Sequence, residues 1–374
     1  MKKILFLIHD LGQGGAEKVL VNLVNHLDKK KFDVTVMSIF DIGENKQFLD
    51  SSLHYKYCFK HMVRGNSHFM KLLSPKQLHK WLIKDKYDIE VAYLEGPCAR
   101  IISGCPDFNT KRVSWIHIQQ KDAMQAAASF RNIKEATDCY NRFNKIICVS
   151  NEVKETFTQA LNITAETDVL YNTNNTNEIY RKSKEEVDDL FIDSQCINII
   201  GIGKLLINKG FDRVVNIVNR LFKDGLNVHL YILGSGPEEN NLKEQINKLK
   251  LEKHVTLLGY QLNPYKYLNK MDLFVCASYA EGFSTAATEA LILGIPVCTV
   301  KVSGMKEMLG NNEYGIITNN DDESFYNGIK RLLENPKLLK HYKNQASIRG
   351  KLFSTSKTVK AVEEMLLGLI EEKK

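Results

Sequence analysis

The sequence is poor in the residues and spacings that mark disulfide-rich, fibrous or metal-binding proteins. Its 374 residues include 7 prolines and 8 cysteines, and no two cysteines form a C-x-x-C pair. That absence excludes the common zinc and thiol–disulfide motifs. Cys148, Cys276 and Cys298 lie inside apolar runs typical of strands, so we expect small, buried, reduced thiols.

Long apolar runs are also missing. The longest early run, Ile4–Ile8, is far shorter than the roughly 20 residues that span a bilayer, and no small-residue cleavage site follows it. The sequence therefore predicts neither a signal peptide nor a transmembrane helix, and it favours a cytoplasmic location.

A third absence is the D-x-D motif, which occurs nowhere in the chain. Paired carboxylates of this kind commonly hold Mg²⁺ or Mn²⁺ on a diphosphate. If the chain handles a diphosphate, we expect lysines and helix N-termini to neutralise it without a metal ion.

The length favours two domains, because single cores usually stop growing at roughly 250–300 residues. Short apolar runs alternate with amphipathic stretches, which is typical of parallel sheets covered by helices. The first series of predicted strands is Lys3–Ile8, Asp33–Ser38, Ile89–Leu94, Arg112–Ile116, Lys145–Val149 and Asp168–Tyr171. The second series is Cys196–Ile202, Asn227–Leu233, His254–Leu258, Asp272–Ala277, Pro296–Val300 and Gly315–Thr318.

A polar stretch at 172–177 separates the two series, and we expect an exposed linker there because it has little to bury. The sequence therefore predicts an α/β protein with two doubly wound, Rossmann-like domains, 1–176 and 177–354. The sequence does not set where the amphipathic segment 355–374 packs, and the first domain is one option. Since open α/β sheets bind ligands at the carboxyl ends of their strands, we expect the domains to face each other across an active-site cleft.

Glycine-containing turns follow four of the predicted strands. Gly14 and Gly15 come after the first strand, Gly203 and Gly210 flank a loop after the seventh, and further turns lie at 234–236 and 259. One such turn is a packing feature about as often as a ligand loop, and none has the G-x-G-x-x-G spacing of dinucleotide binders. Four at strand ends indicate a backbone-lined nucleotide pocket.

Charged residues beside these turns allow two interpretations. Lys204 and Lys209 could neutralise a diphosphate, or they could be solvated loop lysines. Glu281 precedes a predicted helix that starts near Ser284, and Glu289 lies on that helix. The two glutamates could address different parts of one ligand, or could be a helix cap and a solvated surface residue.

The Glu281–Glu289 pair forms an E-x₇-E motif within E-G-F-S-T-A-A-T-E-A that resembles the signature of retaining GT-B glycosyltransferases, called group one or family four. Three other segments are similar to motifs of this family, in the same order: G-G-A-E at 14–17, G-K-L-x-x-x-K-G at 203–210 and S-G-x-x-E at 303–307. The resemblance thus extends over most of the chain.

The resemblance implies a role for each matching residue. Those it places in catalysis are His117, Lys209 and Glu281. Those it places in donor binding are Gly14, Gly15, Gly203, Lys204, Lys209, Gly282, Phe283, Ser284 and Glu289. In the family, the positions of Lys204 and Lys209 hold the diphosphate together with the helix N-termini that follow Gly15 and Glu281. Glu289 would bind the ribose hydroxyls, Glu281 with Gly282 and Phe283 the donor sugar, and His117 the same sugar from the first domain.

Two points qualify these roles. Position 204 is usually arginine in the family, and lysine offers a point charge in place of a bidentate fork. His117 ends a predicted strand, where a histidine is often purely structural.

As a member of this family, the chain would move a hexosyl or N-acetylhexosaminyl group with retention from a nucleotide diphosphate, most often UDP, to a glycan or lipid-linked acceptor. This implies bacterial surface polysaccharide synthesis, with no cofactor, no metal and no nucleic-acid partner. The alternatives are another GT-B enzyme, such as a nucleotide-sugar epimerase or a sugar phosphate synthase, and a non-catalytic nucleotide-binding protein. No motif specifies the donor sugar, the acceptor, the linkage or the oligomeric state.

A basic stretch from Lys56 to Lys86 holds eight cationic residues and one acid, Asp85. Its net charge of +7 equals that of the whole chain. Ser74-Pro75 predicts a helix start, and the helix carries an apolar stripe of Leu78, Trp81 and Leu82. The stripe could cover the following strand or lie on a membrane. We expect the surrounding lysines to favour peripheral docking on an anionic membrane surface.

Overall fold

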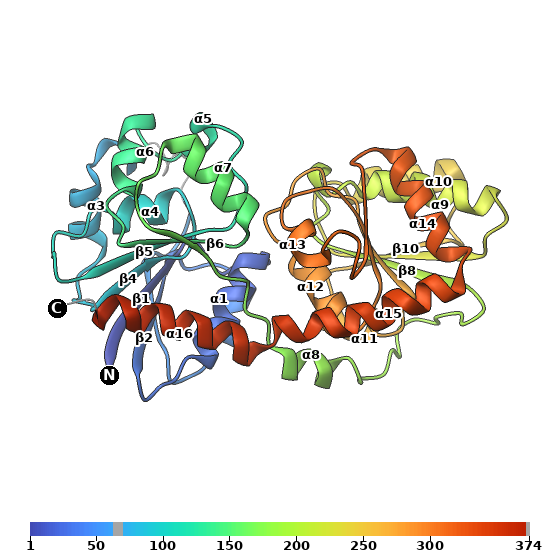
Figure 1. Cartoon of the computed structure of the whole chain (residues 1–374), viewed down its shortest axis with the longest axis horizontal. Coiled ribbons are helices and arrows are strands. Elements are labelled where there is room, and N and C mark those ends of the chain that lie inside the picture. Colours follow the sequence, from blue (N-terminus) through green and yellow to red (C-terminus); the bar gives the residue numbers. More distant parts are fainter. Residues whose placement is uncertain (63–69, 372–374) are drawn as a thin grey trace. The chain divides into compact units, whose positions relative to one another are not determined.

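The computed structural model describes residues 1–62 and 70–371. The chain divides into two compact units. Unit 1 contains Met1–Asn174 and Thr355–Lys374, and unit 2 contains Asn175–Ser354. Figure 1 shows that each unit is a sheet flanked by helices.

Unit 1 is built on a seven-stranded sheet in the order β3-β2-β1-β4-β5-β6-β7, with every pair parallel. Its strands are β1 (Lys2–Ile8), β2 (Phe32–Phe40), β3 (His54–Phe59), β4 (Ile89–Ala92), β5 (Lys111–Ile116), β6 (Lys145–Cys148) and β7 (Thr167–Val169). The six predicted strands are present to within two residues at each end. The additional strand, β3, was missed because it lies at the sheet edge with half of its residues polar or exposed.

The helices of unit 1 follow its strands. They are α1 (Gly15–His26), η1 (Glu44–Phe48), α3 (Pro75–Leu82), α4 (Pro97–Ile102), α5 (Ala123–Ala126), α6 (Ile133–Tyr140), α7 (Asn151–Leu161) and α16 (Thr355–Glu371). Figure 1 shows α16 returning to lie beside α1. Its apolar face, Val359, Val362, Leu366 and Leu369, is buried.

Unit 2 has a six-stranded parallel sheet in the order β10-β9-β8-β11-β12-β13. The strands are β8 (Ile197–Ile202), β9 (Val228–Leu233), β10 (Val255–Gly259), β11 (Leu273–Cys276), β12 (Val297–Val300) and β13 (Ile316–Thr318). The helices are α8 (Thr176–Lys182), η2 (Ile207–Lys209), α9 (Phe211–Lys223), α10 (Glu239–Leu249), α11 (Tyr265–Leu268), α12 (Thr285–Ile292), α13 (Met305–Leu309), α14 (Asp322–Leu333), α15 (Pro336–Gly350) and η3 (Lys351–Phe353). All six predicted strands of this series are confirmed.

Both sheets are doubly wound, so each has one point where the strand order reverses. In unit 1 the reversal falls between β1 and β4, and in unit 2 between β8 and β11. The loops that leave these strands diverge to opposite faces of the sheet and open a crevice at its carboxyl edge, the place where open α/β sheets bind ligands.

The expected linker is not an exposed tether. Asn172, Thr173 and Asn174 are all at least nine-tenths buried, which contradicts the prediction that this polar stretch has no place inside. Side chains of unit 1 satisfy its main chain, since the Asn22 amide donates to the Thr173 carbonyl (3.3 Å) and the Thr355 hydroxyl donates to the Asn174 carbonyl (2.7 Å). The carbonyls of Thr173 and Asn174 are thus paired, whereas Asn172 Oδ1 has no hydrogen-bond partner among the described residues.

The cysteine prediction is confirmed: all eight are free, and Cys148, Cys276 and Cys298 lie buried on central strands. Burial raises the pKa of Cys148 to about 12. Among the described residues no helix combines the length and apolarity needed to cross a bilayer.

At the amino edge of the unit 1 sheet, His79 on α3 and Glu90 on β4 form a buried pair with Nε2 and Oε2 2.8 Å apart. Burial alone would lower the pKa of His79, but its hydrogen bonds with Cys105 and Glu90 outweigh this effect and raise the pKa to about 9. The cluster of His79, Glu90 and Cys105 has the ligand types of a metal site, but the histidine and glutamate are already bonded to each other.

This pair predicts a pH-dependent stability. Because the folded chain holds the His79 proton more tightly than the unfolded chain, the pair stabilises fully below pH 6.5, and its contribution is lost as the pH rises from 6.5 to about 9. We expect the denaturation midpoint of the wild type to fall over this range and that of His79→Gln to fall less. The exposed His54 provides a control, since His54→Gln should keep the wild-type slope. Equal slopes in all three proteins would contradict the assignment.

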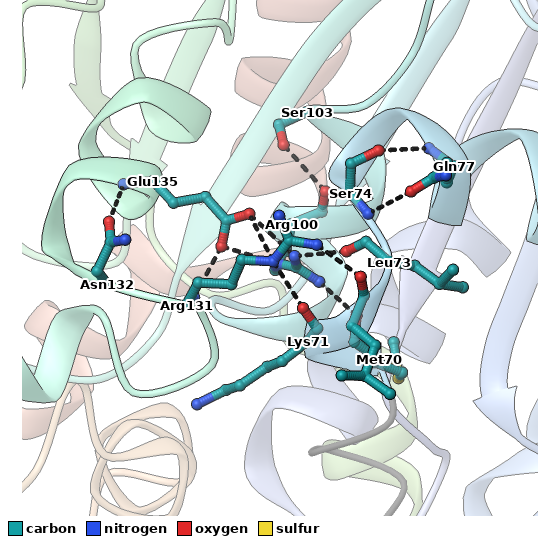
Figure 2. Close-up of polar contacts among 11 residues, drawn as sticks. Met70, Lys71, Leu73, Ser74, Gln77, Arg100, Ser103, Arg131, Asn132 and Glu135 are labelled. Atoms are coloured by element: carbon teal, nitrogen blue, oxygen red, sulfur yellow. Dashed lines mark hydrogen bonds and ion pairs between the residues drawn. The ribbon is translucent and has the colours of Figure 1, made fainter.

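A second buried charge fixes the segment Met70–Ser74 (Figure 2). The Arg100 guanidinium, 2% exposed, donates two hydrogen bonds to the Glu135 carboxylate (2.9 and 3.1 Å) and one each to the carbonyls of Met70 (2.7 Å) and Leu73 (2.8 Å). Burial would raise the pKa of Glu135, but these donors hold it below its usual value. One arginine thus ties α4, α6 and the segment before α3 together.

Candidate functional site

The loop after β8 carries the first group of predicted site residues in unit 2. Gly203 continues from the strand, η2 forms at Ile207–Lys209, and Gly210 begins α9 with φ +66°. A Cβ at Gly210 would lie 2.4 Å from the Ala277 carbonyl oxygen, so only glycine fits. This close approach brings the β8 loop against the β11 loop on the other side of the switch point.

Lys209 and Glu281 meet where these two loops touch. Lys209 Nζ lies 2.5 Å from Glu281 Oε1, and the Ser278 hydroxyl donates to the same oxygen at 2.8 Å. The side chains of Lys209 and Glu281 are 25% and 12% exposed. The sequence predicted both residues as site residues but did not predict that they pair, because 72 positions separate them.

Lys204 differs from Lys209. It is exposed, as the solvated-loop interpretation predicts, whereas Lys209 is half-buried and paired. The charge held in a fixed position at this edge is therefore that of Lys209.

The N-terminus of α12 completes this edge. Ser284 is its N-cap, and the Ser284 hydroxyl accepts from the Ala287 amide at 3.3 Å. Glu281 is therefore not the helix cap. Gly282 and Phe283 precede the cap and are buried, so their backbone forms a rigid turn at the positive end of the helix.

Glu289 lies inside unit 2, not on a solvated face. It is 4% exposed, and the Tyr265 hydroxyl donates to Glu289 Oε1 at 3.0 Å. The two glutamates of the E-x₇-E motif therefore occupy different environments: Glu281 lies at the loop with Lys209, and Glu289 lies about one turn into α12, beside α11. A buried carboxylate with hydroxyl partners is suited to binding hydroxyl groups.

In unit 1 the first predicted motif lies at its expected strand–helix turn. Gly14 is the N-cap of α1 and Gly15 its first residue. The Glu17 carboxylate folds back against Gly14. If Gly14 carried a Cβ atom, both carboxylate oxygens would lie within 2.6 Å of it. The positive end of this helix thus already faces an anionic group of the protein itself.

His117 follows β5 and is 8% exposed. Its ring lies against that of Tyr93, the residue that follows the neighbouring strand β4, with centroids 5.0 Å apart. Burial lowers the pKa of His117 to about 3, so the imidazole is neutral. Among the described residues, His117 Nε2 has no hydrogen-bond partner. A buried nitrogen without a partner is unusual, and this one is a candidate for a ligand contact.

Sequence reasoning missed Glu95, which follows β4. Glu95 Oε2 accepts a hydrogen bond from the main-chain N–H of His117 at 3.0 Å, and burial raises the pKa of Glu95. On the other side of the switch point, Asp10 accepts from the Gly12 amide (2.8 Å) and bonds to His9 Nδ1 (2.7 Å). The sequence signal that could have identified Glu95 is its position. It lies between a buried strand and Gly96-Pro97, which begin a helix.

The fold and these motif residues together define a GT-B glycosyltransferase. Two family models match the chain: Glycosyltransferase Family 4 over residues 13–178 and Glycosyl transferases group 1 over residues 182–349. The chain therefore belongs to the group 1 glycosyltransferases, and it is an enzyme.

Full-length relatives agree. A Campylobacter jejuni protein, N-acetylgalactosamine-N,N'-diacetylbacillosaminyl-diphospho-undecaprenol 4-alpha-N-acetylgalactosaminyltransferase, is 30% identical, with 98% of this chain and all of the relative covered. The lipopolysaccharide core biosynthesis glycosyltransferase LpsE of Rhizobium meliloti is 22% identical over 86% of both chains. Anabaena HepE, solved in complex with UDP, has a TM-score of 0.76 at 20% identity over 98% of this chain and 100% of its own, which shows the shared fold.

Proposed function

We propose that this enzyme transfers a hexosyl or N-acetylhexosaminyl group, with retention, from a nucleotide diphosphate to a lipid-linked or glycan acceptor in bacterial surface polysaccharide synthesis. The observation that carries the donor assignment is the Lys209–Glu281 pair at the switch point of unit 2. It puts a fixed ammonium group beside a helix N-terminus, which suits an anionic leaving group. The relatives acting on diphospho-undecaprenol and lipopolysaccharide core support the acceptor class.

Each residue then has a proposed role within its own unit. Lys209 and the N-terminus of α12 stabilise the diphosphate, with Lys204 contributing a weaker, solvated charge. Glu289 binds the ribose hydroxyls, and Glu281 with the Gly282–Phe283 backbone binds the donor sugar. In unit 1, the neutral His117 offers Nε2 to a sugar hydroxyl. Because Glu17 already covers Gly14, the start of α1 is better suited to hydroxyl groups than to a second phosphate.

As the diphosphate departs, negative charge grows on its oxygens. A preorganised ammonium group and helix dipole stabilise that charge without reorganisation. Glu281 keeps Lys209 in one position in the absence of substrate. No side chain is assigned as a covalent nucleophile.

The first test measures nucleoside diphosphate release across a panel of UDP, GDP and dTDP sugars, with a short polyprenyl diphosphate N-acetylhexosaminide as acceptor. A new glycosidic bond with the donor's anomeric configuration, read by NMR, supports the proposal. An inverted anomer removes the retaining assignment. A product without a new glycosidic bond favours the epimerase alternative, and nucleotide binding without any turnover favours the non-catalytic one.

Transfer should be metal-independent, because lysine and helix dipoles take the place of the absent D-x-D cradle. We expect the rate to remain within about twofold after exhaustive dialysis against EDTA, as is ordinary for a site in which no ion neutralises the diphosphate. Complete loss of activity in EDTA that Mn²⁺ restores would refute this prediction.

We also propose peripheral docking on the inner face of an anionic membrane, through the basic stretch of unit 1. The structure changes which residues carry the proposal. Leu78 is fully buried, so α3 covers the sheet, while Trp81 is 41% exposed and Leu72 is 73% exposed. Lys76, Lys80, Lys84 and Lys86 are exposed, Lys56 pairs with Asp85, and Arg64 lies outside the described residues.

Docking predicts binding to liposomes that contain acidic lipid and not to neutral ones, falling as salt rises. We expect the fourfold change Lys71→Glu, Lys76→Glu, Lys80→Glu and Lys84→Glu to abolish co-sedimentation. A matched fourfold change on unit 2, at Lys243, Lys248, Lys250 and Lys253, should have a much smaller effect. No binding at low salt, or equal losses in both variants, would end the docking proposal.

A further inference from the structure

Glu95 stands at the switch point of unit 1, in the turn between β4 and α4. We propose that its carboxylate binds the acceptor hydroxyl that attacks the donor sugar. This inference rests on the proposed function, because it assumes a sugar-transfer reaction, and it adds a residue that the family motifs do not include.

The geometry leaves Glu95 with unused hydrogen-bonding capacity. Its carboxylate receives the His117 N–H at 3.0 Å and its own main-chain N–H. A carboxylate offers about four acceptor positions, so two N–H donors leave room for an incoming hydroxyl.

A second, independent feature points to a ligand at the carboxyl ends of β4 and β5. The unpartnered Nε2 belongs to a residue more than nine-tenths buried, and its ring packs on that of Tyr93, which follows β4, the strand that borders the switch point. The other ring nitrogen bonds to the Tyr93 main chain. Nε2 is then the acceptor nitrogen of a neutral imidazole, suited to a hydroxyl donor.

The two acceptor groups belong to one local cluster, because the Glu95 carboxylate accepts from the main-chain N–H of the residue that carries Nε2. In any sugar transfer, the attacking hydroxyl must lie beside the donor carbon. If His117 contacts the donor sugar, the adjacent carboxylate is placed for the acceptor. Burial raises the pKa of Glu95, and the residue keeps partial exposure, as a group that receives a substrate hydroxyl requires.

The test separates hydroxyl binding from a structural role through His117. Glu95→Gln keeps an oxygen to accept the His117 N–H but removes the negative charge, and Glu95→Asp keeps the charge on a shorter side chain. The control is Glu152→Gln, an exposed carboxylate two strands away on α7. The probes are UDP-N-acetylgalactosamine and a short polyprenyl diphosphate N-acetylgalactosaminide.

Three quantities are measured: kcat/KM for the acceptor, UDP release to water without acceptor, and the Kd of UDP by calorimetry. We expect Glu95→Gln to lower kcat/KM for the acceptor by about 10–100-fold, the usual cost of losing a charged hydrogen bond. UDP release to water and the Kd of UDP should change less than about twofold, and Glu95→Asp should recover part of the loss. Glu152→Gln should match the wild type.

Unchanged transfer in Glu95→Gln overturns the proposal. So does a parallel fall of transfer and UDP release, which would mean that Glu95 acts only by positioning His117. If the wild type binds UDP but does not turn over these probes, acceptor binding is followed by NMR, and equal binding by wild type and Glu95→Gln overturns the proposal. Failure of the wild type to bind any nucleoside diphosphate of the donor panel would instead remove the proposed function, a separate result.

Discussion

Lys209→Ala should lower kcat/KM for the donor about 100- to 1000-fold, or roughly 3–4 kcal/mol of transition-state stabilisation. The physical reason is that, of the two loop lysines Lys204 and Lys209, Lys209 has the charge that is fixed in place. Its Nζ lies 2.5 Å from Glu281, and its side chain is only 25% exposed. A charge held in advance costs little reorganisation when the diphosphate leaves. The loss should appear mainly in kcat, because the leaving group gains its charge in the transition state.

The measurement is initial-rate kinetics with varied donor, alongside thermal unfolding to confirm folding. Lys270→Ala, an exposed lysine of the same unit, is the matched control and should leave kcat/KM unchanged. Glu289→Gln should show the opposite pattern to Lys209→Ala, with a raised Kd for the nucleotide and a smaller change in kcat. Near-wild-type kinetics in both Lys209→Ala and Glu289→Gln would refute the donor-site assignment.

Arg100→Met should lower the free energy of unfolding of unit 1 by about 3–5 kcal/mol, the usual cost of breaking a buried ion pair from one side. The substitution leaves the Glu135 carboxylate without its main partner, and it leaves the carbonyls of Met70 and Leu73 without their hydrogen-bond donor (Figure 2). For a unit of this size, the loss corresponds to a fall in Tm of about 10 °C.

Arg131→Met is the matched control. Arg131 bonds the carbonyls of Lys71 and Leu72 in the same segment, but it is 42% exposed. Water can replace its contacts, so we expect a loss of less than about 1 kcal/mol. Similar losses in the two variants, measured by thermal and denaturant unfolding, would show that burial of Arg100 contributes nothing beyond its hydrogen bonds.

Local patterns predicted the strands well because each central strand is an apolar run closed by a turn. β3 was not predicted because an edge strand buries only part of one face, and its six residues include His54, Tyr55 and Lys56. The segment 172–174 was misjudged for a related reason. Polar residues can be buried when distant side chains, here Asn22 and Thr355, complete their hydrogen bonds, and a sequence window does not contain those partners.

The candidate site divides in the same way. The motifs predicted Lys209, Glu281, Glu289 and His117 as site residues, and each stands near a strand end or on the helix that follows. Spacing does not reveal which atoms meet. The Lys209–Glu281 pair joins loops 72 positions apart, and Glu95 has no motif of its own. These features depend on strand order, which brings β4 beside both β1 and β5.

The return of α16 to unit 1 has a consequence for biosynthesis. By residue 174 the ribosome has delivered every strand of the first sheet, but the helix that packs against α1 is made only after the whole of unit 2. A nascent or prematurely terminated chain therefore displays the apolar surface of α1 that Val359, Val362, Leu366 and Leu369 later cover. Unit 2, continuous in sequence, can finish folding while unit 1 is still incomplete. Chaperones and proteases can distinguish chains that include α16 from chains that stop before it at this surface, since only α16 covers it.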